Sequence, residues 1–113
     1  MEITEERRDG VIVVAPVGRI DSTTSGALDA HLTRVVGAGP QRVVIDFGGV
    51  DYISSAGLRV LLGLAKRTRD SRGALALAAL GDSVRQVFEL AGFLPLFAIE
   101  PTRERAIQSI ASP

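Results

Sequence analysis

The stretch from Val43 to Leu62 constrains the fold more than any other part of the chain. It begins with Val43 to Phe47, a short apolar and β-branched run that is typical of a buried strand. Gly48 to Ile53 is expected to form a turn and its exit, because two adjacent glycines break the strand. Ser54 and Ser55 then stand directly before a helical pattern. A strand is therefore followed by a helix, with two hydroxyl groups at the junction.

The start of this second helix is a favourable place for a phosphate group. The first backbone N–H groups of a helix have no partner within it, and its N-terminus carries positive partial charge. A phosphate can be bound there or covalently attached. The apolar residues behind the junction recur at helical spacing and are predicted to face the core: Leu58, Leu61, Leu62 and Ala65.

Composition indicates one domain, residues 1–113, with enough apolar side chains for a core, since 46% of its 113 residues are hydrophobic. Thirteen basic and thirteen acidic residues cancel, which is unlike the basic footprint of a nucleic-acid-binding protein. The chain has no cysteine, so disulfides and thiolate metal sites are excluded. The charged start does not resemble a signal peptide, and no apolar run approaches the ~20 residues of a membrane span. We therefore expect a cytoplasmic protein.

Strand and helix patterns alternate along the rest of the chain. Asp9-Gly10 predicts a hairpin between an edge strand over residues 1–8 and an apolar strand over 11–17. Further strands are expected at 74–79 and 96–99, and further helices after Asp21-Ser22, after Gly81 and over 102–110. This order predicts an α/β fold, with a mixed sheet of four or five strands packed by about four helices.

The order resembles the STAS domain, and more narrowly the stand-alone bacterial anti-sigma-factor antagonists. The resemblance covers essentially the whole chain and is carried by Gly18 to Asp21, GRID, and by Asp51 to Leu62. In that family, a serine at the start of the second helix is phosphorylated by an anti-sigma factor that is itself a serine kinase. The common wording there is Asp-Ser-Ser-Gly-Leu or Asp-Ser-Thr-Gly-Leu, which places the phosphoacceptor on Ser55. Ser54 replaces the preceding aspartate, and the family's second acidic position falls on Asp21.

The resemblance implies a partner-switching regulator of transcription that is not an enzyme. Its partners would be an anti-sigma factor serine/threonine kinase and a serine phosphatase, with no nucleic acid. The resemblance implies no cofactor and no metal, and a monomer or weak dimer. Phosphorylation at Ser55 would make the protein release the anti-sigma factor.

Both leading site residues also have ordinary structural interpretations. Ser55 can be a first-turn residue behind a capping Ser54, a role that is compatible with phosphorylation. Asp21 can be the N-cap of the first helix or a turn residue before it. Alternatively, if the strands ending near Val17 and Phe47 run parallel, Asp21 lies near Ser55 at one edge of the sheet, where ligand sites of α/β proteins collect.

Three further residues are candidates for contact with a partner. Gly57 can let a partner's backbone approach the helix start, or be a tolerated glycine that costs ~1 kcal/mol relative to alanine. Arg59 and Arg19 are expected near the same edge, where they either contact the partner or are simply solvated.

Two other functions compete with the switch. One is a non-switching STAS scaffold or sensor in a transporter or stress-signalling complex. The other is a small hydrolase that uses Ser55 as its nucleophile. The sequence offers this hydrolase no recognisable catalytic base and no nucleophile-elbow motif.

Overall fold

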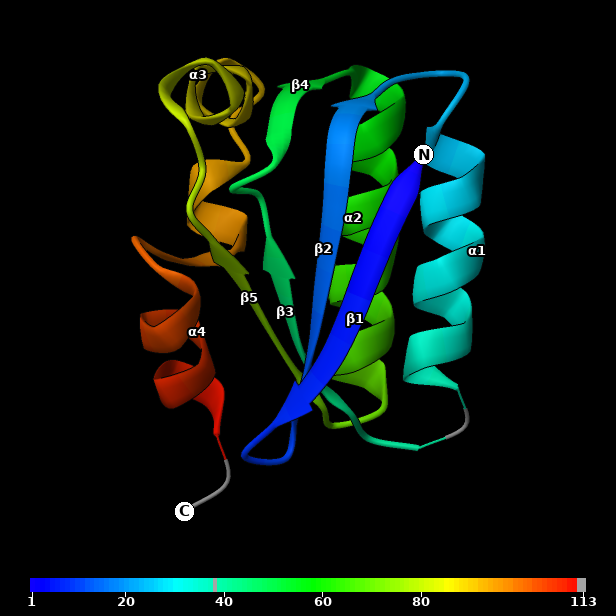
Figure 1. Ribbon diagram of the computed structural model, residues 1–113, viewed down its shortest axis with the longest axis vertical. Helices are drawn as coiled ribbons and strands as arrows, with labels where there is room; N and C mark the ends of the chain where they lie inside the picture. The colour runs from blue at the N-terminus through cyan, green and yellow to red at the C-terminus, as the bar shows by residue number, and fades with distance from the viewer. Residues whose placement is uncertain (38, 112–113) are drawn as a thin grey trace.

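The computed structural model describes residues 1–37 and 39–111, which form six strands, four α-helices and one 3₁₀ turn (Figure 1). The strands are β1 (Glu2–Arg8), β2 (Val11–Ile20), β3 (Arg42–Asp46), β4 (Val50–Ile53), β5 (Ala74–Ala78) and β6 (Ala98–Glu100). The helices are α1 (Ser25–Val36), α2 (Ser55–Asp70), α3 (Asp82–Leu90) and α4 (Arg103–Ile110), and the 3₁₀ turn is η1 (Leu94–Leu96). The α/β class and the four helices confirm the prediction.

The hairpin between β1 and β2 turns at the predicted dipeptide. Asp9 and Gly10 have φ values of 55° and 76°, and positive φ at both central residues defines the type I′ turn that suits antiparallel strands. Arg8 pairs with Val11 directly across it.

The sheet has one strand more than predicted, because the exit from the glycine turn is itself a strand. The order is β1-β2-β3-β5-β6, and β4 pairs with the far end of β2. Strand β2 is also longer than predicted. It pairs in parallel with β3 through Val14, and then with β4 from Gly18 to Ile20. Pro16 falls between these two partners, where its missing N–H interrupts neither parallel ladder.

Helices cover the two faces of the sheet unequally (Figure 1). Helices α1 and α2 lie side by side on the first face, and α3 packs against β4. The main core is here, and Leu28, Leu61, Leu64 and Phe88 are fully buried within it. On the second face, a smaller core joins α4 to β2, β3 and β5.

The predicted apolar face of α2 is largely confirmed, with one error. Leu62 was predicted to face the core but is 41% exposed, and Leu64 is buried. The buried row of α2 follows a three-residue step through Leu58, Leu61 and Leu64, which turns Leu62 outward. On α3, Val84 and Phe88 are buried, and Ala91 is exposed just beyond the end of the helix.

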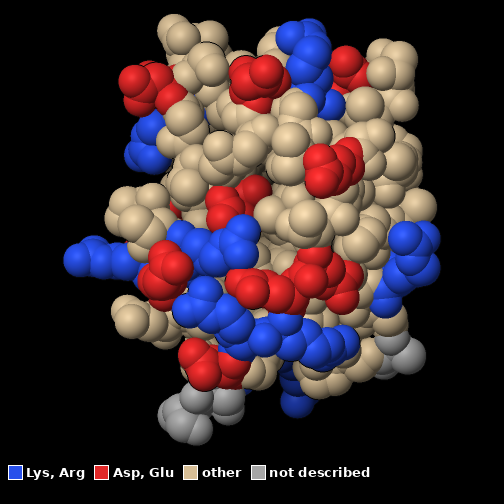
Figure 2. Space-filling view, in the orientation of Figure 1, with Lys and Arg blue, Asp and Glu red and all other residues tan. Residues whose placement is uncertain are grey.

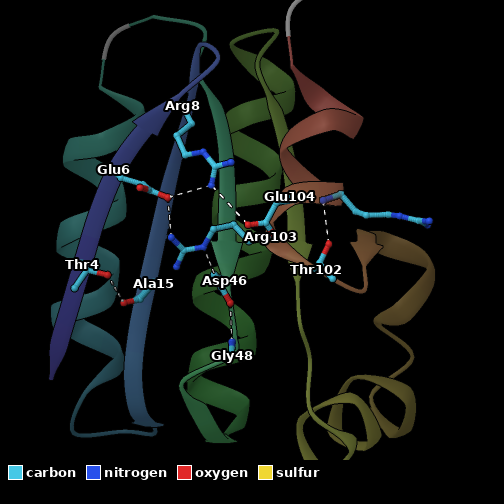
Figure 3. A network of polar contacts seen from close by, with 10 residues as sticks. Thr4, Glu6, Arg8, Ala15, Asp46, Gly48, Thr102, Arg103 and Glu104 are labelled. Carbon is cyan, nitrogen blue, oxygen red and sulfur yellow. Dashed lines mark hydrogen bonds and ion pairs between the residues drawn. The ribbon is translucent and has the colours of Figure 1, made fainter.

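Charged side chains cover part of the second face (Figure 2). Arg103 of α4 donates from Nε to Asp46 Oδ2 and from Nη1 to Glu6 Oε1, both at 2.7 Å (Figure 3). Arg8 lies 3.7 Å from Glu6 and 3.8 Å from Glu104. This network connects β1, β3 and α4 across the second face.

Among the described residues, no helix is long and apolar enough to cross a membrane.

Candidate functional site

The candidate site lies where β2 and β4 end side by side. Ile20 is in register with Ile53, and the N–H of Ser54 donates to the carbonyl of Ile20 at 2.8 Å. Asp21 and Ser54 are the next residues on the two neighbouring strands. Their chain positions therefore meet at one sheet edge, as the parallel topology predicted, although β4 and not β3 is the strand that brings Ser54 there.

Ser54 and Ser55 have different structural roles. Ser54 is the N-cap of α2, and its Oγ accepts a hydrogen bond from the N–H of Gly57 at 3.3 Å. Ser54 is half-buried, whereas Ser55 is the first residue of the helix and is exposed. Within residues 1–37 and 39–111, the structure records no hydrogen bond from the Ser55 hydroxyl. The cap is thus made by one serine, and the next has an accessible hydroxyl.

Gly57 packs against the ends of β2 and β4. It is buried, and a Cβ placed on it would lie 2.6 Å from Ile20 Cγ2 and 2.8 Å from Ile53 Cγ1. This packing gives position 57 a structural reason to be glycine, and its approach to a partner's backbone stays a prediction. Its missing side chain allows α2 to pack closely against the ends of β2 and β4.

Asp21 organises the loop between β2 and α1. Its Oδ1 accepts hydrogen bonds from the Thr23 N–H at 3.0 Å, the Thr23 hydroxyl at 2.7 Å and the Thr24 N–H at 3.2 Å. The N-cap of α1 is Thr24, so the alternative that Asp21 caps this helix is wrong. The bonds from the Thr23 hydroxyl and then the Thr23 N–H lower the pKa of Asp21 below its ordinary value.

Arg19 connects the two strand ends across the site. Its guanidinium lies 4.1 Å from the ring centre of Tyr52, which is a cation–π contact between residues in register on β2 and β4. Arg19 Nε is also 3.7 Å from Asp21 Oδ2. Arg59 is exposed one helical turn beyond Ser55.

The sequence prediction did not include Tyr52, Thr23 or Thr24. The signal for Tyr52 was weak, because the four residues Val50-Asp51-Tyr52-Ile53 do not follow the two-residue alternation of a strand. Across residues 1–37 and 39–111, no three His, Cys, Asp or Glu side chains come together in a group that could hold a metal ion.

Comparison with known proteins identifies the family. The STAS domain family matches residues 2–106. A protein of Bordetella bronchiseptica named as the anti-sigma factor antagonist BtrV is 43% identical over 106 residues, which is 94% of this chain and 91% of that protein. The chain belongs to the STAS domain family.

Solved structures give the same result. The crystal structure of an anti-sigma factor antagonist from Mycobacterium paratuberculosis superposes with a TM-score of 0.89 at 30% identity, covering 98% of this chain and 94% of that one. The Bacillus protein SpoIIAA in its phosphorylated form superposes with a TM-score of 0.73 at 20% identity, covering 96% and 99%. At 20% identity, the likeness to SpoIIAA shows only that the two proteins share a fold.

Proposed function

We propose that this protein is an anti-sigma-factor antagonist whose binding is switched by phosphorylation of Ser55. In the unmodified form it binds an anti-sigma factor that is a serine/threonine kinase, and a sigma factor is thereby freed. In the phosphorylated form it releases the anti-sigma factor. The relatives named as anti-sigma factor antagonists support the class of partner.

The observation that carries the proposal is the separation of roles between the two serines. Ser54 caps the helix, so the hydroxyl of Ser55 can be modified without removing that cap. Ser55 is also exposed, so a kinase can reach it. The phosphate would sit at the positive end of α2, where the helix dipole and free N–H groups favour it.

Electrostatics gives a direct reason for release. A phosphate adds about −1.5 to −2 charge. Burying that charge against a partner without matched cations costs several kcal/mol, and a loss of ~4 kcal/mol weakens binding about a thousandfold. Because the kinase supplies ATP and Mg²⁺, this chain needs no cofactor and acts as a regulator, not as an enzyme.

The flanking residues shape the surface that the kinase meets. Arg19 contacts Tyr52 and so bridges the ends of β2 and β4, Asp21 organises the loop after β2, and Arg59 extends the surface along α2. A serine phosphatase would complete the cycle by restoring the binding form. With this role, we expect the protein to act in the cytoplasm as a monomer or weak dimer.

The decisive experiment is phosphorylation by the kinase that co-purifies with this protein, followed by mass spectrometry and affinity measurement. Phosphate should be found on Ser55, and the modified protein should bind the kinase far more weakly. Ser55→Ala should keep the fold and the affinity but block phosphorylation. Ser54→Ala is the matched control, because it should cost ~1 kcal/mol as a lost cap and leave Ser55 modifiable.

Several results would contradict the proposal. Phosphate found on Ser54, Thr23 or Thr24, and not on Ser55, would show that Ser55 is not the phosphoacceptor. No phosphate at all would favour the non-switching scaffold or sensor. Labelling of Ser55 by a serine-directed probe without any kinase would favour a hydrolase.

A further inference from the structure

The exposed side of α2 carries a row of cations that leads away from Ser55. Ser55, Arg59, Leu62, Lys66 and Arg69 are all exposed. Their alternating spacing of four and three residues places them on one helix face. At about 1.5 Å per residue, the row is about 21 Å long. This spacing is the one by which two helices lie alongside each other.

The cations of this row are not neutralised by the chain itself. Within residues 1–37 and 39–111, the structure records no ion pair for Arg59, Lys66 or Arg69. By contrast, Arg67 on the neighbouring face lies 3.2 Å from Asp29 of α1. Asp70, the acid of α2, lines a separate hollow beside α1.

An apolar groove runs beside the row. It has a volume of about 320 Å³ between α2 and η1, and it is lined in part by Leu62, Ala65, Lys66, Arg69 and Leu96. Leu62 is 41% exposed and Leu96 is 54% exposed. A second hollow of about 310 Å³ shares three of these residues and continues towards β6. Apolar side chains rimmed by cations thus form one continuous surface, which we name the α2 groove.

We propose that the α2 groove binds an acidic amphipathic helix of the anti-sigma partner, an inference that rests on the proposed function. The apolar side of that helix would cover Leu62 and Leu96. Its carboxylates, one helical turn apart, would pair with Lys66 and Arg69. An acidic helix fits because the groove supplies cations and apolar surface without acidic side chains of its own.

The position of Ser55 at the end of the same row connects docking to the switch. A phosphate on Ser55 would repel the carboxylates of a helix that lies along the row. It would also attract Arg59, which stands four residues further along the helix, and so remove a cation from the partner. One modification would thereby weaken the contact in two ways.

The first test compares two charge-reversed double variants in binding to the purified kinase partner. Lys66→Glu with Arg69→Glu should weaken binding about tenfold or more, and the loss should shrink at high salt. Arg34→Glu with Arg105→Glu is the matched control, because it changes net charge equally at exposed positions on other helices. That control should change affinity less than about threefold, the scale of ordinary surface charges.

The outcome separates this inference from the proposed function. Equal affinity of the two double variants, with Ser55 phosphorylation still abolishing binding, would refute the α2 groove and leave the switch intact. Circular dichroism of both variants should show unchanged helix content.

The second test uses the absence of cysteine from the chain. Leu62→Cys, labelled with a photoreactive maleimide, should cross-link to a partner segment with acidic residues at helical spacing. Val17→Cys, on the opposite face of the sheet and similarly exposed at 43%, should not cross-link to that segment. Cross-links from position 62 to a second copy of this chain, or to a segment without acidic residues, would overturn the inference.

Discussion

The two faces of the sheet are held by different interactions, although the same strands build both. On the first face, branched and leucine side chains from the strands pack against α1, α2 and α3 and exclude water. On the second face, α4 buries only Ala106 and Ile107 fully, and the Arg103 network covers part of the remaining surface. Apolar packing dominates the first face, and charge-assisted hydrogen bonds contribute strongly to the second.

The difference explains how the proposed phosphate on Ser55 could be added without disturbing the apolar core of the first face. Helix α2 is anchored on the first face by fully buried Leu61 and Leu64, while Ser55 lies free at its start. A change at Ser55 therefore alters the surface and not the packing. The second face is expected to lose stability in high salt, which screens its ion pairs, whereas the first should not.

The largest expected effect is at Leu61, in the apolar core of the first face. Leu61→Ala should lower the free energy of unfolding by about 2–5 kcal/mol, because truncation leaves a cavity where the side chain was fully buried. Leu62→Ala is the neighbouring control and should change it by less than about 0.5 kcal/mol. Urea denaturation measures both, and equal losses would place Leu61 outside the core.

The next effect should come from the second face. Arg103→Ala should lower the free energy of unfolding by about 1–3 kcal/mol, because Asp46 and Glu6 lose hydrogen bonds from a charged donor. The loss should be smaller in high salt. Arg105→Ala, on the exposed side of the same helix, should be nearly silent. A salt-independent loss for Arg103→Ala would show that its packing matters more than its charge.

A loss of similar size is expected where α2 meets the strand ends. Gly57→Ala should cost about 1–3 kcal/mol, since the new Cβ would overlap Ile20 and Ile53. Gly63→Ala on the same helix meets no atom within 4 Å and should stabilise by up to about 1 kcal/mol. Thermal denaturation of the pair tests the contrast. Stabilisation by both substitutions would mean that Ile20 and Ile53 can move to make room for the new Cβ at position 57.

The smallest effect concerns Asp21. Its lowered pKa means that the ionised carboxylate stabilises the folded loop. That stabilisation should be present above the ordinary aspartate pKa of about 3.9 and be lost as the pH falls through the lower folded value. Asp21→Asn should remove this acid dependence while changing stability little at neutral pH.

Denaturation of wild type and Asp21→Asn at pH 7 and pH 3 measures the effect of the carboxylate. Identical pH responses of the two proteins would show that the ionised carboxylate of Asp21 does not stabilise the loop. In the phosphorylation and binding assays, a silent Asp21→Asn would also remove it from the site.

Much of the fold was predictable because local signals agreed with the global pattern. The Asp9-Gly10 turn and the serine cap of α2 each depend on a few neighbouring residues, and both formed as expected. Strand β4 was missed because it has only four residues and follows two glycines. Its pairing with β2 depends on a long-range register that local patterns do not contain. The close packing at Gly57 was missed for the same reason.

The serine cap at position 54 affects how large a change in charge the proposed phosphorylation of Ser55 would make. The common family wording has an aspartate at this position, which would leave a permanent negative charge beside the acceptor. An aspartate and a serine cap a helix about equally well, so the structural role survives the exchange. The local charge differs, however. Here Ser54 and Ser55 are both neutral before Ser55 is modified. Under the proposed switch, a partner that binds this edge would meet a larger relative change in charge than it would beside an aspartate.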